Sequence, residues 1–307
     1  MCERSHALTR VGGVNSQCRV TAHGGARMRR DLTSRFAGYG LPRSQSDSVA
    51  LMRLLSATLT ATLTSAAAAP LRELRDPSTF AALYYLPPNP EPHMPLLLYL
   101  HGAGESGSNV RGLISEGATG TPPVELEHAT ALPILTRRFI VVAPQTDHGW
   151  IASEVGRFLD FVLDSTKSGL PSIDARRCYV TGHSMGGYGA LAAATLRTFD
   201  ENGSSPRFAA VVPVAPAGAP SAEALKGVSV WAFHGRNDVV CPSRVSELLV
   251  AELRRQGTND SDAKITLYEH APAPKGWPDY DGHGATIPAY ATPALYRWLL
   301  ERSVRAR

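Results

Sequence analysis

Cysteine is scarce in this chain, which has only four in 307 residues. No two of them have the Cys-x-x-Cys spacing of a zinc site or a thioredoxin-type centre. The sequence therefore predicts neither a disulfide scaffold nor a metal site, and it leaves the redox compartment open.

Long apolar runs are also missing. No stretch of about eighteen or more apolar residues occurs, so no integral membrane segment is expected. The chain is nevertheless 43% hydrophobic and 19% charged, which allows a sizeable buried core and excludes global disorder. Its length fits one large α/β domain with some additional chain.

Excess charge is absent from most of the sequence. The formal net charge is +4, and residues 1–50 hold eight Arg, no Lys and only three acidic residues. Because the remaining residues are almost balanced in charge, the positive total predicts no nucleic-acid partner.

Residues 1–69 are predicted to lie outside the fold, as a targeting or disordered leader. The Arg-rich, acid-poor start is typical of an organelle transit peptide. A second interpretation begins at Met52, where a charged start, a moderately apolar stretch and the alanines Ala66 to Ala69 are typical of a secretory signal. A plain disordered tail is the third. The protein would then be organellar, secreted or cytoplasmic respectively, and the globular domain is expected over residues 70–307.

Strand-like and helix-like segments alternate from residue 80 onward. Several strand candidates are continuous apolar runs, as expected for strands that are covered on both faces. This alternation predicts an α/β fold with a doubly wound, mostly parallel sheet. The expected strands are residues 80–86, 96–100, 139–143, 178–181, 208–214, 228–233 and 264–269, and the expected helices are residues 151–165, 185–198, 244–256 and 290–302.

The strongest local signal is the segment Gly182-His183-Ser184-Met185-Gly186, between a predicted strand and a predicted helix. A strand-to-helix turn this sharp strains its central residue, and flanking glycines remove side chains that would clash. Ser184 is therefore predicted to be a nucleophile, with the Met185 N–H as a donor to an oxyanion. A plain tight turn is the alternative.

A second glycine-rich segment, His101 to Gly107, follows the strand expected at residues 96–100. Its glycines fit the dinucleotide fingerprint G-x-G-x-x-G, but no second strand ending in an acidic residue follows at the required distance. We favour an oxyanion loop, in which the N–H of Ala103, with Gly104 beside it, approaches a substrate carbonyl oxygen. No cofactor is then expected.

A serine nucleophile needs a base, and the base needs an orienting acid. Asp238 follows the carboxyl end of a predicted strand, where a parallel sheet collects its functional groups. Two histidines follow the last predicted strand, His270 directly at its end and His283 before the final helix. His283, which is flanked by glycines, is the predicted base, and His270 remains the alternative.

Residues 80–303 resemble an α/β-hydrolase, and more narrowly the esterases of the phospholipase/carboxylesterase and feruloyl-esterase-like group. Some relatives in that group are labelled as peptidases. The resemblance implies a triad of Ser184, Asp238 and His283 that hydrolyses esters, in the chain order of that superfamily. One departure is that the segment 271–282 is longer than the usual turn before the histidine. His270 therefore remains an alternative base. The matching stretches are LLLYLHGAGESG (Leu96 to Gly107), VVAPQ (Val141 to Gln145), YVTGHSMGGYGAL (Tyr179 to Leu191), VWAFHGRNDVV (Val230 to Val240) and AYATPALYRWLL (Ala289 to Leu300).

Clues to the substrate are weaker. Trp150 and Gly104 are predicted to contact it, and Trp277 could add a wall, although each tryptophan could equally be a packing residue. Glu105 is expected to fix a local turn. Because only residues 215–227 separate two late strands, no large cap domain is expected, and the site should be open to a small-molecule ester.

Three functions follow from these residues: hydrolysis of carboxylic esters or thioesters, peptide hydrolysis on the same triad, and ligand binding without catalysis. The first is favoured because a hydroxyl, an imidazole and a carboxylate all stand at suitable positions. The sequence does not define the oligomeric state.

Overall fold

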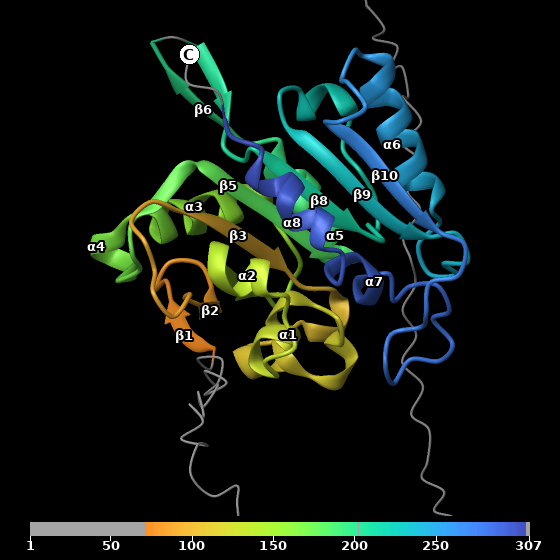
Figure 1. Ribbon diagram of the computed structural model, residues 1–307, viewed down its shortest axis with the longest axis horizontal. Coiled ribbons are helices and arrows are strands. Elements are labelled where there is room, and N and C mark those ends of the chain that lie inside the picture. Colours follow the sequence, from red (N-terminus) through yellow and green to blue (C-terminus); the bar gives the residue numbers. More distant parts are fainter. Residues whose placement is uncertain (1–70, 202, 305–307) are drawn as a thin grey trace, which may run out of the picture. The chain divides into compact units, whose positions relative to one another are not determined.

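The computed structural model describes residues 71–304 apart from residue 202 (Figure 1). The predicted leader, residues 1–69, lies outside the described residues. The described residues 71–304 fall within the domain that was predicted over residues 70–307, and they belong to one compact unit of the chain.

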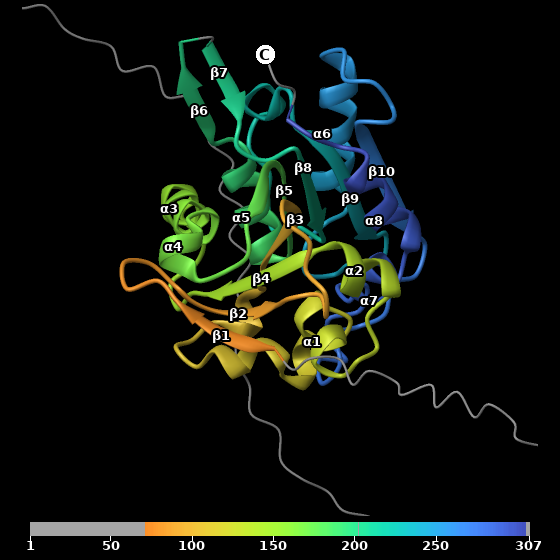
Figure 2. The same ribbon diagram turned by 60° about the vertical axis from the view of Figure 1, so that its left-hand side comes forward.

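The core of the fold is an eight-stranded sheet with the order β1-β2-β4-β3-β5-β8-β9-β10 (Figures 1 and 2). The six strands that follow β2 in this order are mutually parallel. At the edge of the sheet, β2 runs antiparallel to β4, and β1 runs antiparallel to β2. The predicted α/β architecture with a mostly parallel sheet is therefore confirmed. The strands are β1 (Arg72–Arg75), β2 (Ala81–Tyr85), β3 (Met94–Leu100), β4 (Ile140–Gln145), β5 (Ile173–His183), β8 (Ala210–Val214), β9 (Ser229–Gly235) and β10 (Ala263–Tyr268).

The central strands are buried on both faces because their side chains alternate between two apolar layers. Every residue of β3 is buried. Leu96, Leu98 and Leu100 pack into one hydrophobic cluster, whereas Leu97 and Tyr99 pack into the other. A continuous apolar run is thus what a strand between two helical layers requires.

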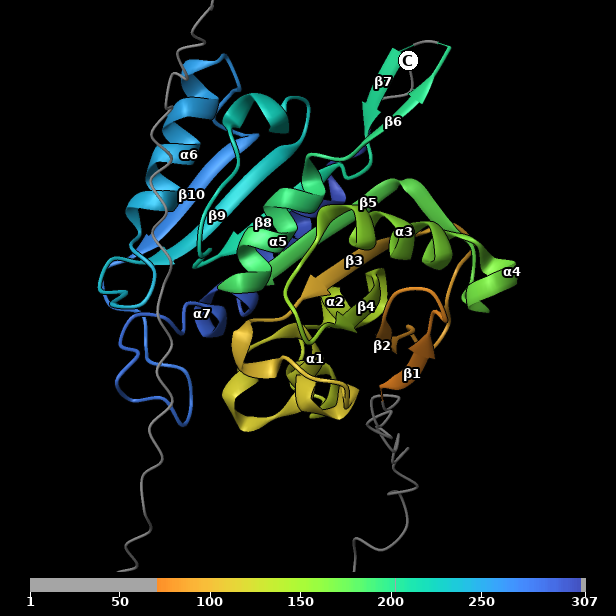
Figure 3. The same ribbon diagram turned by 180° about the vertical axis from the view of Figure 1, so that it is seen from behind.

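Helices cover both faces of the sheet. The apolar sides of α3 (Ala152–Leu163), α5 (Met185–Ala194) and α6 (Arg244–Arg255) fill one cluster, and Figure 3 looks onto that side. The opposite cluster is filled by α1 (Pro122–Glu127), α2 (Pro133–Arg138), α7 (Thr286–Tyr290) and α8 (Pro293–Leu300), which face the viewer in Figure 1. A short helix, α4 (Ser165–Ser168), follows α3.

Two helix predictions need correction. The helix expected over residues 185–198 ends at Ala194, and the chain turns into a hairpin of β6 (Arg197–Asp200) and β7 (Gly203–Pro206), which stands away from the main sheet (Figure 2). The helix expected over residues 290–302 begins only at Pro293, as α8, and Tyr290 is the last residue of the preceding helix α7. Pro293 has no N–H to continue the first helix, and its fixed φ suits the first position of the second.

The connection between β8 and β9 is short, as expected. It contains one 3-10 turn, Ala222–Leu225, and the described part of the chain has no large cap over the sheet. Within residues 71–304, residue 202 aside, no helix is long and apolar enough to cross a membrane.

The central place of β3 makes a stability prediction. Replacing the fully buried Leu98 with alanine should lower the free energy of unfolding by about 2 to 5 kcal/mol, because a cavity would open between the sheet and its helices. Leu248 on α6 is 53% exposed, and its replacement with alanine is the matched control, with a change within about 0.5 kcal/mol. Urea denaturation of both variants measures the difference, and equal losses would contradict this packing.

Candidate active site

Ser184 stands on a strained turn between β5 and α5. Its φ is 56° and its ψ is −116°, a conformation that costs a non-glycine residue on the order of 1–3 kcal/mol. The flanking glycines make the turn possible. A Cβ on Gly182 would lie 2.2 Å from the carbonyl oxygen of Gly186, and one on Gly186 would lie 2.0 Å from that of Leu100. The G-x-S-x-G spacing is therefore a steric requirement of this turn.

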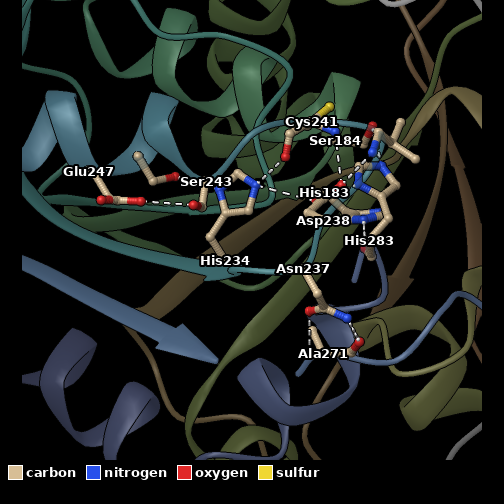
Figure 4. A network of polar contacts seen from close by, with 12 residues as sticks. His183, Ser184, His234, Asn237, Asp238, Cys241, Ser243, Glu247, Ala271 and His283 are labelled. Atoms are coloured by element: carbon tan, nitrogen blue, oxygen red, sulfur yellow. Dashed lines mark hydrogen bonds and ion pairs between the residues drawn. The ribbon is translucent and has the colours of Figure 1, made fainter. Parts of the chain in front are cut away.

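Ser184, His283 and Asp238 form a continuous chain of hydrogen bonds (Figure 4). The Ser184 hydroxyl lies 2.9 Å from His283 Nε2, and His283 Nδ1 lies 2.8 Å from Asp238 Oδ2. A carboxylate can only accept, so Nδ1 carries the hydrogen and Nε2 is free to accept the serine proton. The three side chains, predicted from distant parts of the sequence, are thus in contact in this structure.

Asp238 is surrounded by hydrogen-bond donors. Its Oδ1 accepts from the backbone N–H groups of Val240 and Cys241, each at 2.8 Å. Burial by itself would raise the pKa of this carboxyl, but hydrogen bonds from His234 and His283 and from the backbone outweigh it and hold the pKa well below its usual range. Asp238 is therefore ionised throughout the neutral range.

His234 is a contact of Asp238 that the sequence analysis did not single out. Its fully buried ring places Nε2 at 2.9 Å from the Cys241 carbonyl oxygen and at 3.3 Å from Asp238 Oδ2, and Nδ1 at 2.8 Å from Ser246 Oγ. Both neighbours of Nε2 are acceptors, so Nε2 carries the hydrogen. Figure 4 shows His234 and His283 on opposite sides of Asp238. The signal that could have identified His234 is its place near the end of a buried strand, four residues before Asp238.

Asn237 joins the loop of the acid to the loop of the base. Its amide nitrogen donates to the carbonyl oxygen of Ala271 and to the Asp281 carboxylate, and its amide oxygen accepts from the Ala271 N–H (Figure 4). These contacts fix the start and the end of the long segment 271–282 against the turn that carries Asp238.

The alternative base, His270, lies away from this chain of contacts. It follows β10 and is exposed, whereas His283 is buried with 4% of its surface accessible. The structure therefore brings His283, and not His270, to Ser184. The extra residues of the segment 271–282 return the chain from the end of β10 to the serine.

His183 supports the backbone of His283. Its Nε2 lies 2.8 Å from the carbonyl oxygen of His283 and must donate to it, and the two rings are 4.7 Å apart. Burial, followed by the nearby His283, lowers the pKa of His183 to about 3, so this ring is neutral at pH 7. It was not recognised from the sequence, because a residue beside a nucleophile has no distinguishing spacing.

The glycine-rich loop after β3 begins at a firmly held histidine. His101 is fully buried, and its Nε2 accepts from the Thr146 N–H at 3.0 Å. Its Nδ1 therefore carries the hydrogen and donates to the Gly102 carbonyl oxygen at 2.7 Å. Burial lowers the pKa of His101 to about 4, which keeps the ring neutral.

The loop then brings two residues to the surface. Ala103 and Gly104 are exposed on a 3-10 turn, Ala103–Glu105, and Met185, the residue after Ser184, begins α5. The dinucleotide interpretation needed a helix at this point. The three-residue 3-10 turn does not provide one. Among the residues that the structure describes, no group of three His, Cys, Asp or Glu could hold a metal ion.

Trp150 lies behind this loop. It is 8% exposed, its Nε1–H donates to the His101 carbonyl oxygen at 3.0 Å, and its ring packs edge-on against His101 and Phe80. The contact of Trp150 with substrate stays a prediction. The structure shows that Trp150 packs against the start of the glycine-rich loop. Trp277 is 42% exposed and is linked to His283 through Tyr280, with successive ring centres 5.1 and 6.4 Å apart.

Comparison with solved structures identifies the fold. A thermostable esterase matches with a TM-score of 0.55 and 27% identity over 76% of this chain, which spans 62% of that esterase. A thermophilic esterase from the Planctomycetes species Thermogutta terrifontis matches with a TM-score of 0.50 and 15% identity, over 76% of this chain and 92% of that one. A puromycin-hydrolysing peptidase of Mycobacterium tuberculosis matches with a TM-score of 0.50 and 16% identity, over 75% of this chain and 38% of that one.

Sequence comparison adds no closer assignment. No protein-family model matches the chain, and no curated protein matches it. The sheet order, the strained turn at Ser184 and the structural neighbours agree with one another, and the chain has the α/β-hydrolase fold.

Proposed function

We propose that this protein is a serine hydrolase that cleaves carboxylic esters or thioesters through an acyl-enzyme. One observation carries the proposal: the hydrogen-bonded chain of Ser184, His283 and Asp238, with Ser184 on a strained turn at the N-terminus of a helix. Its structural neighbours named as esterases support the choice of substrate class.

The first half of the reaction forms the acyl-enzyme. The Ser184 hydroxyl attacks the carbonyl carbon of the ester while its proton moves to His283 Nε2. The carbonyl oxygen becomes an oxyanion, which the N–H groups of Ala103 and Met185 stabilise. As the tetrahedral intermediate collapses, His283 returns the proton to the leaving alcohol or thiol, and the acyl group stays on Ser184.

The second half repeats these steps with water. His283 takes a proton from a water molecule that attacks the acyl carbon, and the same amides hold the new oxyanion. The carboxylic acid leaves, and Ser184 regains its proton from His283. Each cycle consumes one ester or thioester and one water, and it releases a carboxylic acid and an alcohol or thiol.

The charges of the site suit this sequence of steps. His283 becomes positively charged twice in each cycle, and Asp238, with its lowered pKa, supplies a fixed negative charge against Nδ1. His101 and His183 remain neutral at pH 7, so they add no positive charge that would oppose protonation of His283.

The substrate is expected to be a small-molecule ester that enters from solvent. The short connection 215–227 forms no large cap over the sheet, and Ala103 and Gly104 of the proposed oxyanion loop are exposed. Gly104 is proposed to contact the acyl group, since no side chain stands between its backbone and the surface.

Labelling with a fluorophosphonate tests the nucleophile. The native protein should react covalently and lose aryl-ester hydrolysis in parallel, whereas the Ser184→Ala variant should show neither reaction, because only an activated serine attacks the probe. Mass spectrometry of the labelled peptide locates the adduct. Labelling that survives this substitution would remove Ser184 from the mechanism, and cleavage of peptides without any aryl-ester hydrolysis would replace the ester assignment with a peptidase.

A pair of histidine variants tests the base. His283→Ala should lower kcat by about four to six orders of magnitude, because the serine loses its proton acceptor. His270→Ala is the matched control and should leave kcat within about threefold, since the side chain is exposed away from Ser184. Steady-state kinetics on one aryl ester measures both. A large loss in the His270 variant with little loss in the His283 variant would reverse the assignment.

A further inference from the structure

Glu105 places a carboxyl group directly behind the proposed oxyanion loop. It is the third residue of the 3-10 turn Ala103–Glu105, and it is 8% exposed, whereas Ala103 and Gly104 before it are exposed. The Glu105 carbonyl oxygen accepts from the Gln145 side chain at the end of β4, at 2.8 Å. The turn is thus anchored on the protein side by Glu105, and Ala103 and Gly104 lie on the solvent side.

The carboxyl group folds back toward the start of the turn. A Cβ placed on Gly102 would lie 3.2 Å from Glu105 Oε2 and 3.3 Å from His183 Nδ1, so both polar atoms lie on the side of Gly102 that a side chain would occupy. The Oε2 atom is buried and has no hydrogen-bond partner among the described residues. An unpartnered buried oxygen favours the protonated form of a carboxyl group, because an ionised one would lose its hydration without compensation.

The titratable groups around Glu105 come from two strand ends and the loop itself. They are Tyr99 of β3, with Tyr290 of α7 packed on it, His183 at the end of β5, and His101 at the start of the loop. At pH 7 these phenols and imidazoles are neutral, because burial raises the pKa of both tyrosines and lowers the pKa of both histidines. None of these groups therefore offers a positive charge to a Glu105 carboxylate.

Glu105 is therefore expected to exist in both the protonated and the ionised form near neutral pH. Burial raises the pKa of this carboxyl to about 7, against hydrogen bonds from the backbone N–H groups of Gly102 and Glu105 that favour the ionised form. A neutral carboxyl leaves the loop amides free to stabilise an oxyanion. An ionised carboxyl group adds a buried negative charge next to Gly102. The proposed oxyanion is a second negative charge at the same loop, and the two negative charges repel each other.

We propose that Glu105 is a positioning residue whose protonated carboxyl group, folded onto Gly102, holds the Ala103 amide toward the reacting carbonyl group, and whose ionisation impairs oxyanion stabilisation. This inference rests on the proposed hydrolase function. It gives Glu105 a role beyond fixing a turn, since the proton on its side chain controls the loop that the reaction uses.

The pH dependence of ester hydrolysis tests the proposal. In the native protein, kcat and kcat/KM should fall as the pH rises past about 7, by about tenfold or more, because the ionised form weakens oxyanion stabilisation. Glu105→Gln keeps the size and polarity of the side chain but cannot ionise, so its alkaline fall should move upward by at least about one pH unit. Glu105→Ala keeps the backbone carbonyl that Gln145 binds but removes the buried carboxyl group, and it should lower kcat at pH 6 by more than Glu105→Gln does, with little change in KM.

Glu223→Gln is the matched control. Glu223 is 71% exposed on its side chain, in the 3-10 turn Ala222–Leu225, so this variant should follow the native pH profile. A Glu105→Gln profile that superimposes on the native one would overturn the proposal, and so would a native profile without an alkaline fall.

A stability measurement separates this inference from the proposed function. The pKa of Glu105 is raised above its unfolded value of 4.5, so its contribution to stability is fully present below pH 4.5 and is lost as the pH rises toward about 7. The denaturation midpoint of the native protein, relative to that of Glu105→Gln, should therefore fall over this range. If Ser184-dependent labelling is absent at every pH, the hydrolase proposal fails and the positioning role fails with it. If labelling occurs but the midpoint difference is flat, only the role of Glu105 fails.

Discussion

The close approach of the elbow glycines to the end of β3 is the constraint on which the site depends. Leu100 pairs with Gly182 in the sheet, and Gly186 lies so near the Leu100 carbonyl oxygen that no side chain fits between them. His101 is the next residue after Leu100. The same contact therefore brings the start of α5 against the start of the glycine-rich loop.

Parallel strands explain why the remaining groups arrive at the same edge. The loop follows β3, the serine follows β5, Asp238 follows β9, and His283 follows the long segment after β10. In a parallel sheet these carboxyl ends lie side by side, so residues far apart in the chain converge without any dedicated scaffold. Asn237 then ties the last two loops together through Ala271 and Asp281.

Three histidines hold the parts of the site in place. His101 and His234 use both ring nitrogens, for the loop and for the surroundings of the acid, and His183 uses Nε2 for the backbone of the base. The fourth histidine, His283, is the one whose Nε2 faces the serine hydroxyl. Burial keeps His101 and His183 neutral, and the donors around Asp238 keep that carboxyl ionised, so the fixed charge next to the base is negative.

The sequence by itself determined seven strands of the sheet and the candidate residues, whereas β1 was not predicted. Continuous apolar runs such as that of β3 predicted strands covered on both faces, and the glycines around Ser184 predicted a sharp turn, because both are local requirements of sterics and burial. The hairpin β6–β7 and the helices α1 and α2 were not predicted. Their short segments lack a sustained apolar period, and the helix pattern that begins at residue 185 continues past the point where the chain leaves the sheet.

Only the tertiary structure decided which groups touch. His270 and His283 were both acceptable by order along the chain, and the choice depended on the path of the segment 271–282, which local propensities do not determine. His183 and His234 acquired their roles from partners on other strands, and Glu105 acquired its raised pKa from burial that its polar, glycine-rich surroundings in the sequence did not indicate. Spacing along a chain specifies local conformation, whereas hydrogen-bond partners and desolvation depend on residues that are distant in sequence and adjacent only in the folded protein.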